Sequence, residues 1–177
     1  MRLRWALVLA AAALVVPISV SAAVSPADYK NAAKFCKALR ADIGKTTFKQ
    51  TYGTNENRSN AYGKCVSKNA RELDQNHASA VKACRAERDA NEAAFVEKYG
   101  TNKRGTNAFG KCVSAKEDQA EDQDHDAIVN AAKTCRAERA TDPAAFREKY
   151  GTNRNKRNAF GKCVSKLAKE NEQQNAS

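Results

Sequence analysis

Apolar residues recur at helical spacing along much of the chain, and the pattern is clearest between the second and third cysteines. One stripe there has residues separated by three or four positions, the spacing of neighbours on one face of an α-helix. These residues are Val66, Ala70, Leu73, His77, Val81 and Cys84. The pattern predicts a long helix that continues from one part of the chain into the next.

The segment between Cys112 and Cys135 is four residues longer than the segment between Cys65 and Cys84. Four residues are close to one helical turn, so the longer segment keeps its apolar positions on roughly the same face. Acidic side chains nevertheless interrupt this second stripe. Residues 119–128 are therefore compatible both with a solvated helix and with a flexible acidic linker.

Capping residues predict a short helix between the long ones. Asp142 followed by Pro143 suits an N-cap and the first helical residue, and Gly151 suits a C-cap. Asn91 and Gly100 have the same roles about fifty residues earlier. A polar loop follows each short helix. The asparagines expected to cap the next helices are Asn60, Asn107 and Asn158.

The chain contains three copies of one unit. Residues 84–114 match residues 135–165 at 22 of 31 positions, and residues 48–67 match residues 95–114 at 12 of 20. Such internal similarity is the signature of a repeat protein. The predicted boundaries are 1–23 for a signal peptide, 24–70 for copy 1, 71–118 for copy 2, 119–128 for the acidic linker or helix, 129–169 for copy 3 and 170–177 for a polar tail. A first helix is expected over 26–41, and the tail from residue 166 is expected to fray.

Each copy has two cysteines, and an even number of cysteines in an exported chain favours disulfides. Pairing between copies would join Cys65 to Cys84, which lie about 28 Å apart if the helix between them is continuous. A disulfide needs Cα atoms within about 7 Å, so pairing within copies is preferred. The predicted bonds are Cys36–Cys65, Cys84–Cys112 and Cys135–Cys163. The predicted fold is all-α, with three tandem disulfide-stapled helical repeats linked by long helices.

Three aromatic residues recur in each copy, two of them four residues apart on the short helix. That spacing places both rings on one face, so we expect a small core beside each disulfide; a stacking platform for bases or sugars is the alternative. Gly63, Gly110 and Gly161 fall in the first turn of a helix, where glycine is costly. Close backbone packing near the disulfide would explain them.

The first residues have the three parts of a secretory signal peptide. Arg2 and Arg4 precede an apolar run that ends at Pro17, and small residues follow up to Ala23. The run is too short to span a bilayer. We therefore expect export to the periplasm, the cell envelope or the medium, with no membrane span after cleavage.

The chain is cationic, with a formal net charge of +11. In copies 2 and 3, basic residues concentrate around the loops and in the helix after the first cysteine. The candidates for binding an anion are Lys103, Arg104, Lys111, Arg154, Lys156, Arg157 and Lys162. A merely solvated cationic surface is the alternative. The partners to be expected are an anionic cell-envelope polymer, a polysaccharide or extracellular nucleic acid.

Other chemistry finds little support in the sequence. There is no Cys-x-x-Cys motif, and His77 and His125 do not occupy equivalent places, so neither a redox pair nor a repeated zinc site is expected. No cofactor is implied. The recurring polar residues are three lysines and three serines, without a recurring histidine or carboxylate. They are Lys64, Lys111, Lys162, Ser67, Ser114 and Ser165.

The segments Phe95-Val-Glu-Lys-Tyr-Gly-Thr-Asn102 and Asn107-Ala-Phe-Gly-Lys-Cys-Val-Ser114 resemble repeats of secreted bacterial proteins that have no assigned activity. The resemblance covers roughly residues 30–169. It implies export and repetition but no reaction, ligand or functional residue.

These observations favour a non-enzymatic secreted or cell-envelope repeat protein that binds an anionic polymer through basic loops or serves as a spacer. A cationic effector that acts on anionic membranes is one alternative, although the helices lack the large apolar face of such proteins. An enzyme without a recognisable motif is the other.

Overall fold

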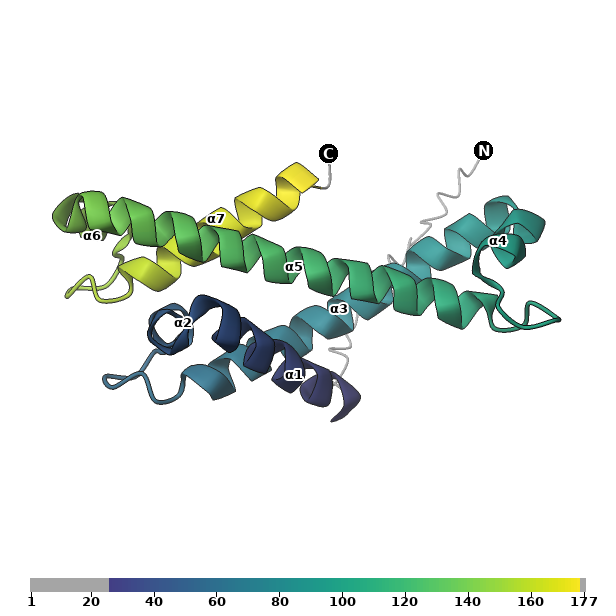
Figure 1. The fold of residues 1–177 in the computed structure, drawn as a ribbon, viewed down its shortest axis with the longest axis horizontal. Coiled ribbons are helices and arrows are strands. Elements are labelled where there is room, and N and C mark those ends of the chain that lie inside the picture. The colour runs from purple at the N-terminus through teal and green to yellow at the C-terminus, as the bar shows by residue number, and fades with distance from the viewer. Residues whose placement is uncertain (1–25, 176–177) are drawn as a thin grey trace, which may run out of the picture.

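The computed structural model describes residues 26–175, and this range is helical without strands (Figure 1). The predicted fold class is confirmed. The helices are α1 (Pro26–Ile43), α2 (Lys45–Tyr52), α3 (Ala61–Ala90), α4 (Glu92–Tyr99), α5 (Ala108–Thr141), α6 (Pro143–Tyr150) and α7 (Ala159–Asn175). The predicted signal peptide, 1–23, lies outside the described residues.

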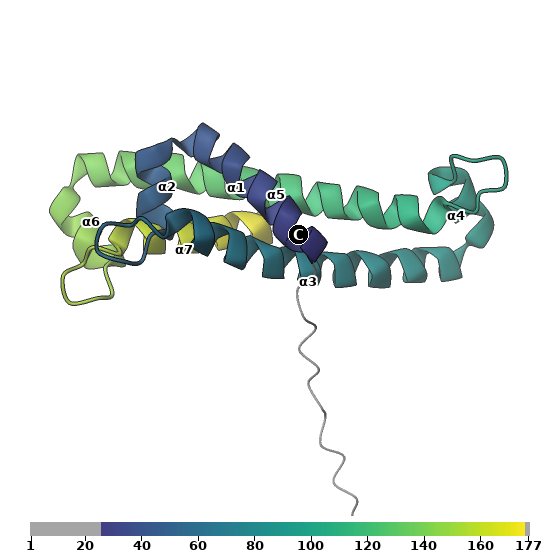
Figure 2. The ribbon, with the colours of Figure 1, turned by 90° about the horizontal axis from the view of Figure 1, so that it is seen from below.

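The long helices α3 and α5 run in opposite directions and cross near the middle of an elongated molecule (Figures 1 and 2). Copies 1 and 3 lie together at one end, and α4 of copy 2 lies alone at the other. Residues 119–128 belong to α5, so the helical interpretation of this acidic segment is correct. The polar tail is also helical up to Asn175, where fraying was predicted. Asn171 Nδ2 donates to the Ala127 carbonyl at 3.4 Å and ties this tail to α5.

The buried residues form two separate cores. The larger core joins copies 1 and 3 and contains residues of α1, α2, the start of α3, the C-terminal half of α5, α6 and α7. Its large side chains include Phe35, Leu39, Ile43, Phe48, Ile128, Phe146, Phe160 and Val164. The smaller core belongs to copy 2 alone and is built around Phe95, Cys84, Cys112 and Val113. Copy 2 is therefore an independent packing unit at its own end of the molecule.

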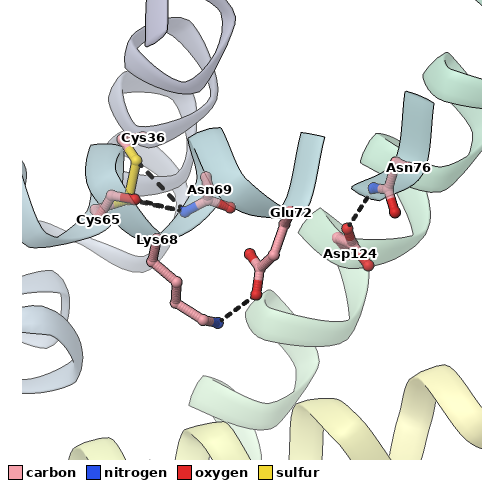
Figure 3. A network of polar contacts seen from close by, with 7 residues as sticks. All are labelled: Cys36, Cys65, Lys68, Asn69, Glu72, Asn76 and Asp124. Atoms are coloured by element: carbon pink, nitrogen blue, oxygen red, sulfur yellow. Dashed lines mark hydrogen bonds and ion pairs between the residues drawn. A yellow bond between two sulfur atoms is a disulfide. The ribbon is translucent and has the colours of Figure 1, made fainter. Parts of the chain in front are cut away.

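The three predicted disulfides are present, each with a Cα–Cα distance of 6.0 Å. All six cysteines are fully buried. In copy 1 the buried Asn69 lies beside the bond, where its Nδ2 donates to the Cys65 carbonyl at 2.9 Å (Figure 3). Each bond closes a loop of nearly thirty residues, which corresponds to about 3.6 kcal/mol of chain entropy removed from the unfolded state.

The aromatic rings fill the space between the disulfides and the short helices, as predicted for a small core. Phe95 and Tyr99 have ring centroids 5.0 Å apart, and the corresponding pairs in the other copies are similar. Tyr62 is the exception: it is 39% exposed, and its hydroxyl donates to the Ala33 carbonyl. The rings are thus used for packing, which argues against the stacking platform.

The short helices begin where their caps predicted. Asp142 accepts hydrogen bonds from the backbone N–H groups of Ala144 and Ala145, and Asn91 accepts one from Ala94. Both helices end at a glycine, as expected. Copy 1 instead begins its short helix after Gly44, which has a φ of +80° and makes no side-chain cap.

The three repeated asparagines lie at the expected helix starts but do a different job. The Asn107 side chain makes no cap bond to α5. Its Oδ1 accepts from the Thr101 and Asn102 N–H groups at 3.1 and 3.4 Å, and its Nδ2 donates to Thr101 Oγ1. Asn60 and Asn158 make the same contacts in their own loops. Asn60 and Asn107 are thus N-cap residues by position, as predicted, but their side-chain amides close the loop instead of bonding to the helix.

The repeated glycines also differ from the prediction. At Gly161 an added Cβ atom would lie 2.8 Å from the Thr51 carbonyl oxygen, because the start of α7 packs against α2. At Gly63 and Gly110 the same atom would meet nothing within 4 Å. Close packing thus explains one of the three glycines, and its neighbour is a helix of another copy instead of the disulfide.

The separate core of copy 2 gives a direct test of the disulfide. We expect Cys84→Ala/Cys112→Ala to cost about 3 kcal/mol and to expose the amides of α4, while the joined core of copies 1 and 3 stays protected. Amide hydrogen exchange with peptide resolution measures both effects. Unchanged protection in α4 would contradict the view that the disulfide holds this unit together.

The glycines provide a matched comparison. Gly161→Ala forces α2 away from α7, and we expect it to lower the free energy of unfolding by about 1–3 kcal/mol. Gly63→Ala and Gly110→Ala fill open space in a helix, and we expect each to raise it by about 0.5–1 kcal/mol. Urea denaturation at low protein concentration measures the three values. Equal effects at all three positions would contradict this packing.

Candidate anion-binding cleft

The loops of copies 1 and 3 meet, although they are far apart in the sequence. Arg58 Nη2 donates to the Arg157 carbonyl at 2.6 Å, and Arg157 Nη2 donates to the Glu56 carbonyl at 3.2 Å. Each arginine thus bonds the backbone of the opposite loop. This exchange holds the two loops side by side at one end of the molecule.

A cleft of about 660 Å³ lies between these loops and the start of α7. Its lining is rich in asparagine, threonine and basic residues. The polar side chains that line it include Gln50, Thr54, Asn55, Arg58, Asn153, Asn155, Arg157, Asn158 and Lys162. None of the described lining residues is aromatic. The cleft therefore offers amide and hydroxyl groups together with positive charge.

Positive charge predominates around the cleft. Three cationic side chains line it against one carboxylate, that of Glu56. Burial lowers the pKa of Arg58 below its ordinary value, and the nearby guanidinium groups of Arg157 and Arg139 lower it further. Like charges are thus held close together, which is unfavourable without an anion between them.

The backbone at Arg58 supports the same interpretation. Arg58 has a φ of +55°, in the left-handed region, where the equivalent residue of copy 2 is Gly105 with a φ of +65°. A side chain with a Cβ atom costs roughly 1–2 kcal/mol in this conformation. Copies 1 and 3 thus both carry a basic residue at a position where glycine would be relaxed, since Lys156 has a φ of +54°, and of the two only Arg58 lines the cleft.

The predicted anion-binding residues do not form one surface. Arg157 and Lys162 line the cleft, whereas Lys156 is paired with Glu148 at 2.8 Å. Arg154 is exposed on the same loop. Lys103, Arg104 and Lys111 are exposed on copy 2, at the opposite end of the molecule (Figure 1).

Sequence reasoning missed Arg58 and the loop amides. The signal for Arg58 was its alignment with Lys156 of copy 3, at the same position of the repeated loop. The amides were noticed only as possible helix caps. These residues come together because copies 1 and 3 are in contact. No local sequence pattern predicts that contact.

A second hollow of about 400 Å³ lies beside the cleft, between α3 and α7, and Thr51 and Ser165 line both. The charges there are mixed. Lys68 is paired with Glu72 at 3.1 Å (Figure 3). Burial raises the pKa of Glu172, and the Asp124 carboxylate adds to this effect. The positive character is therefore confined to the mouth formed by the loops.

The two histidines lie away from the cleft and serve contacts between helices. His125 Nε2 lies 3.0 Å from Asp42 Oδ2, joining α5 to α1, and His77 contacts Glu117 across α3 and α5. Asn76 donates to Asp124 nearby (Figure 3). Glu117 and Asp124 of the acidic segment of α5 thus contact α3, whereas the contact with α1 is made by His125. The recurring lysines and serines of the three copies are all exposed.

No protein family, curated protein or solved structure matches the chain. Within residues 26–175, no helix is both long and apolar enough to cross a membrane. The three disulfides indicate an oxidising, extracytoplasmic environment.

The asparagine that closes the cleft loop can be tested directly. Asn158→Ala removes the bonds from Thr152 and Asn153, and we expect these two amides to exchange at least about fivefold faster, since a lost hydrogen bond is worth about 1 kcal/mol. Asn107→Ala should have the same effect on Thr101 and Asn102 of copy 2. Unaltered exchange in both variants would contradict the loop-closing role.

Proposed function

We propose that the chain is a non-enzymatic, secreted or cell-envelope protein that binds an acidic polysaccharide or related anionic wall polymer in the cleft between the loops of copies 1 and 3. One observation carries this proposal. Arg58 and Arg157, 99 residues apart in the sequence, are held together at the mouth of the cleft. An anion between them relieves their mutual repulsion.

The lining favours a sugar polymer over a nucleic acid. Asparagine and threonine side chains offer donors and acceptors for hydroxyl groups, and the cations match carboxylate, phosphate or sulfate groups. Proteins that bind single-stranded nucleic acids commonly stack bases on aromatic rings. No aromatic residue lines the described part of this cleft, and the repeated rings other than Tyr62 pack in the cores. The second hollow lies beside the cleft and shares Thr51 and Ser165 with it, which suits a ligand longer than one sugar unit.

Export is part of the proposal. The first 23 residues have the pattern of a signal peptide, and the disulfides suit the compartment to which such a signal leads. An anionic wall polymer or polysaccharide is found in that compartment.

A matched pair of lysines tests the cleft. Lys162 and Lys111 occupy the same position in copies 3 and 2, but only Lys162 lines the cleft. We expect Lys162→Gln to weaken binding to polygalacturonate several-fold, corresponding to about 0.5–1 kcal/mol, and Lys111→Gln to leave it unchanged. Isothermal titration at two salt concentrations measures both variants.

A stronger perturbation removes both loop arginines. We expect Arg58→Gln/Arg157→Gln to weaken binding about tenfold or more, while Lys103→Gln/Arg104→Gln, which removes the same charge from the copy 2 loop, binds as the unaltered chain does. Equal losses in both double variants would point to non-specific charge attraction and overturn the cleft as the site. Leakage of anionic vesicles without polymer binding would instead favour the membrane-active alternative.

A further inference from the structure

Copy 3 shows what the repeated unit can bind on one of its faces. There the short helix α2 of copy 1 lies against the start of α7, with Gly161 at the contact. Arg139 Nη1 donates to Gln50 Oε1 of α2 at 2.8 Å, and its guanidinium lies over the Phe160 ring at 4.7 Å. A glycine, an aromatic ring and an arginine together form the seat for this short helix.

Copy 2 has the same three residues at the same positions, but no helix within residues 26–175 covers them. We call Arg88, Phe109 and Gly110 the glycine face. Arg88 lies over the Phe109 ring at 5.5 Å, so the local arrangement is conserved within the chain. Gly110 meets nothing within 4 Å, and Phe109 is half-buried whereas Phe160 is 3% exposed.

An uncovered glycine in a helix is destabilising and has no evident function in the single chain, and this holds for both Gly63 and Gly110. Only at Gly110 does an arginine lie over the neighbouring ring as it does in copy 3. Glycine destabilises a helix by roughly 0.5–1 kcal/mol relative to alanine because of its greater freedom when unfolded. At Gly161 the close approach of α2 accounts for that cost. A helix of the same kind on the glycine face would account for it at Gly110.

The chain itself carries a helix that fits this face. In α4 the residue equivalent to Gln50 is Glu97, which is exposed. Its carboxylate would lie opposite Arg88 where the neutral Gln50 lies opposite Arg139, so the charges are complementary. In the single chain Arg88 is paired with the exposed Asp89 at 3.0 Å, and Glu97 would compete with this exposed pair. The other two short helices are less suitable. The α2 helix already packs against α7, and Glu148, the equivalent residue of α6, is paired with Lys156. Copy 2 lies alone at its end of the molecule, away from copies 1 and 3 (Figure 2).

We propose that the glycine face of copy 2 binds α4 of a second copy of this chain, so that the protein associates with itself through the end opposite the cleft. The contact repeats between molecules the packing of α2 on α7 within one molecule. It is independent of any ligand in the cleft.

Charge reversal tests the proposed pairing in the full chain by sedimentation over a range of protein concentrations. Arg88→Glu alone and Glu97→Arg alone each place like charges opposite one another, and each should weaken self-association at least about tenfold. Arg88→Glu/Glu97→Arg restores opposite charges and should recover it. Circular dichroism confirms that each variant is folded. A double variant as weak as the single variants overturns the proposal.

Glycine substitution tests the close approach. Gly110→Ala should abolish self-association, while Gly63→Ala, its matched control in copy 1, should not affect it. The cleft variant Arg58→Gln/Arg157→Gln should associate as the unaltered chain does, so failure of this proposal is distinct from failure of the proposed function. An unaltered chain that stays monomeric at the highest soluble concentration, or one whose association survives Gly110→Ala, overturns the proposal.

Discussion

The structure depends on its three disulfides, which join α1 to α3, α3 to α5 and α5 to α7. Cys84 lies near the end of α3 and Cys112 near the start of α5, and their bond turns these helices into a hairpin. The units contain few large apolar residues, and small domains of this kind usually need such bonds. The disulfides fix the antiparallel arrangement of successive long helices, and the other contacts between these helices depend on it.

Because successive hairpins turn in alternating directions, the first and third turns lie at one end and the second at the other (Figure 1). This alternation explains why copies 1 and 3 share a core while copy 2 keeps its own. It also explains why two nearly equivalent basic loops approach each other. Arg58 and Arg157 are neighbours because the chain reverses direction twice between copy 1 and copy 3, which brings both loops to the same end. The cleft between them is formed by residues of both copies.

Much of the fold could be predicted because local sequence patterns specify it, and these patterns recur in each copy. Helical spacing, the caps at Asp142 and Asn91, and the separation of the cysteines led to the helices and the disulfides. The cleft could not be predicted in the same way, because it arises where two copies meet and no periodicity records that meeting. The asparagines were misjudged for a related reason: Asn107 is close enough to cap a helix, but its amide reaches back six residues to Thr101.

The continuous helix α5 has a mechanical consequence. With 34 residues and a rise of about 1.5 Å per residue, it is about 50 Å long, whereas a flexible chain of equal length would fluctuate around a shorter average separation. The rigid α5 helix therefore keeps the two ends of the molecule apart. A ligand bound at the loops of copies 1 and 3 and a partner bound at copy 2 would therefore be kept at a fixed spacing.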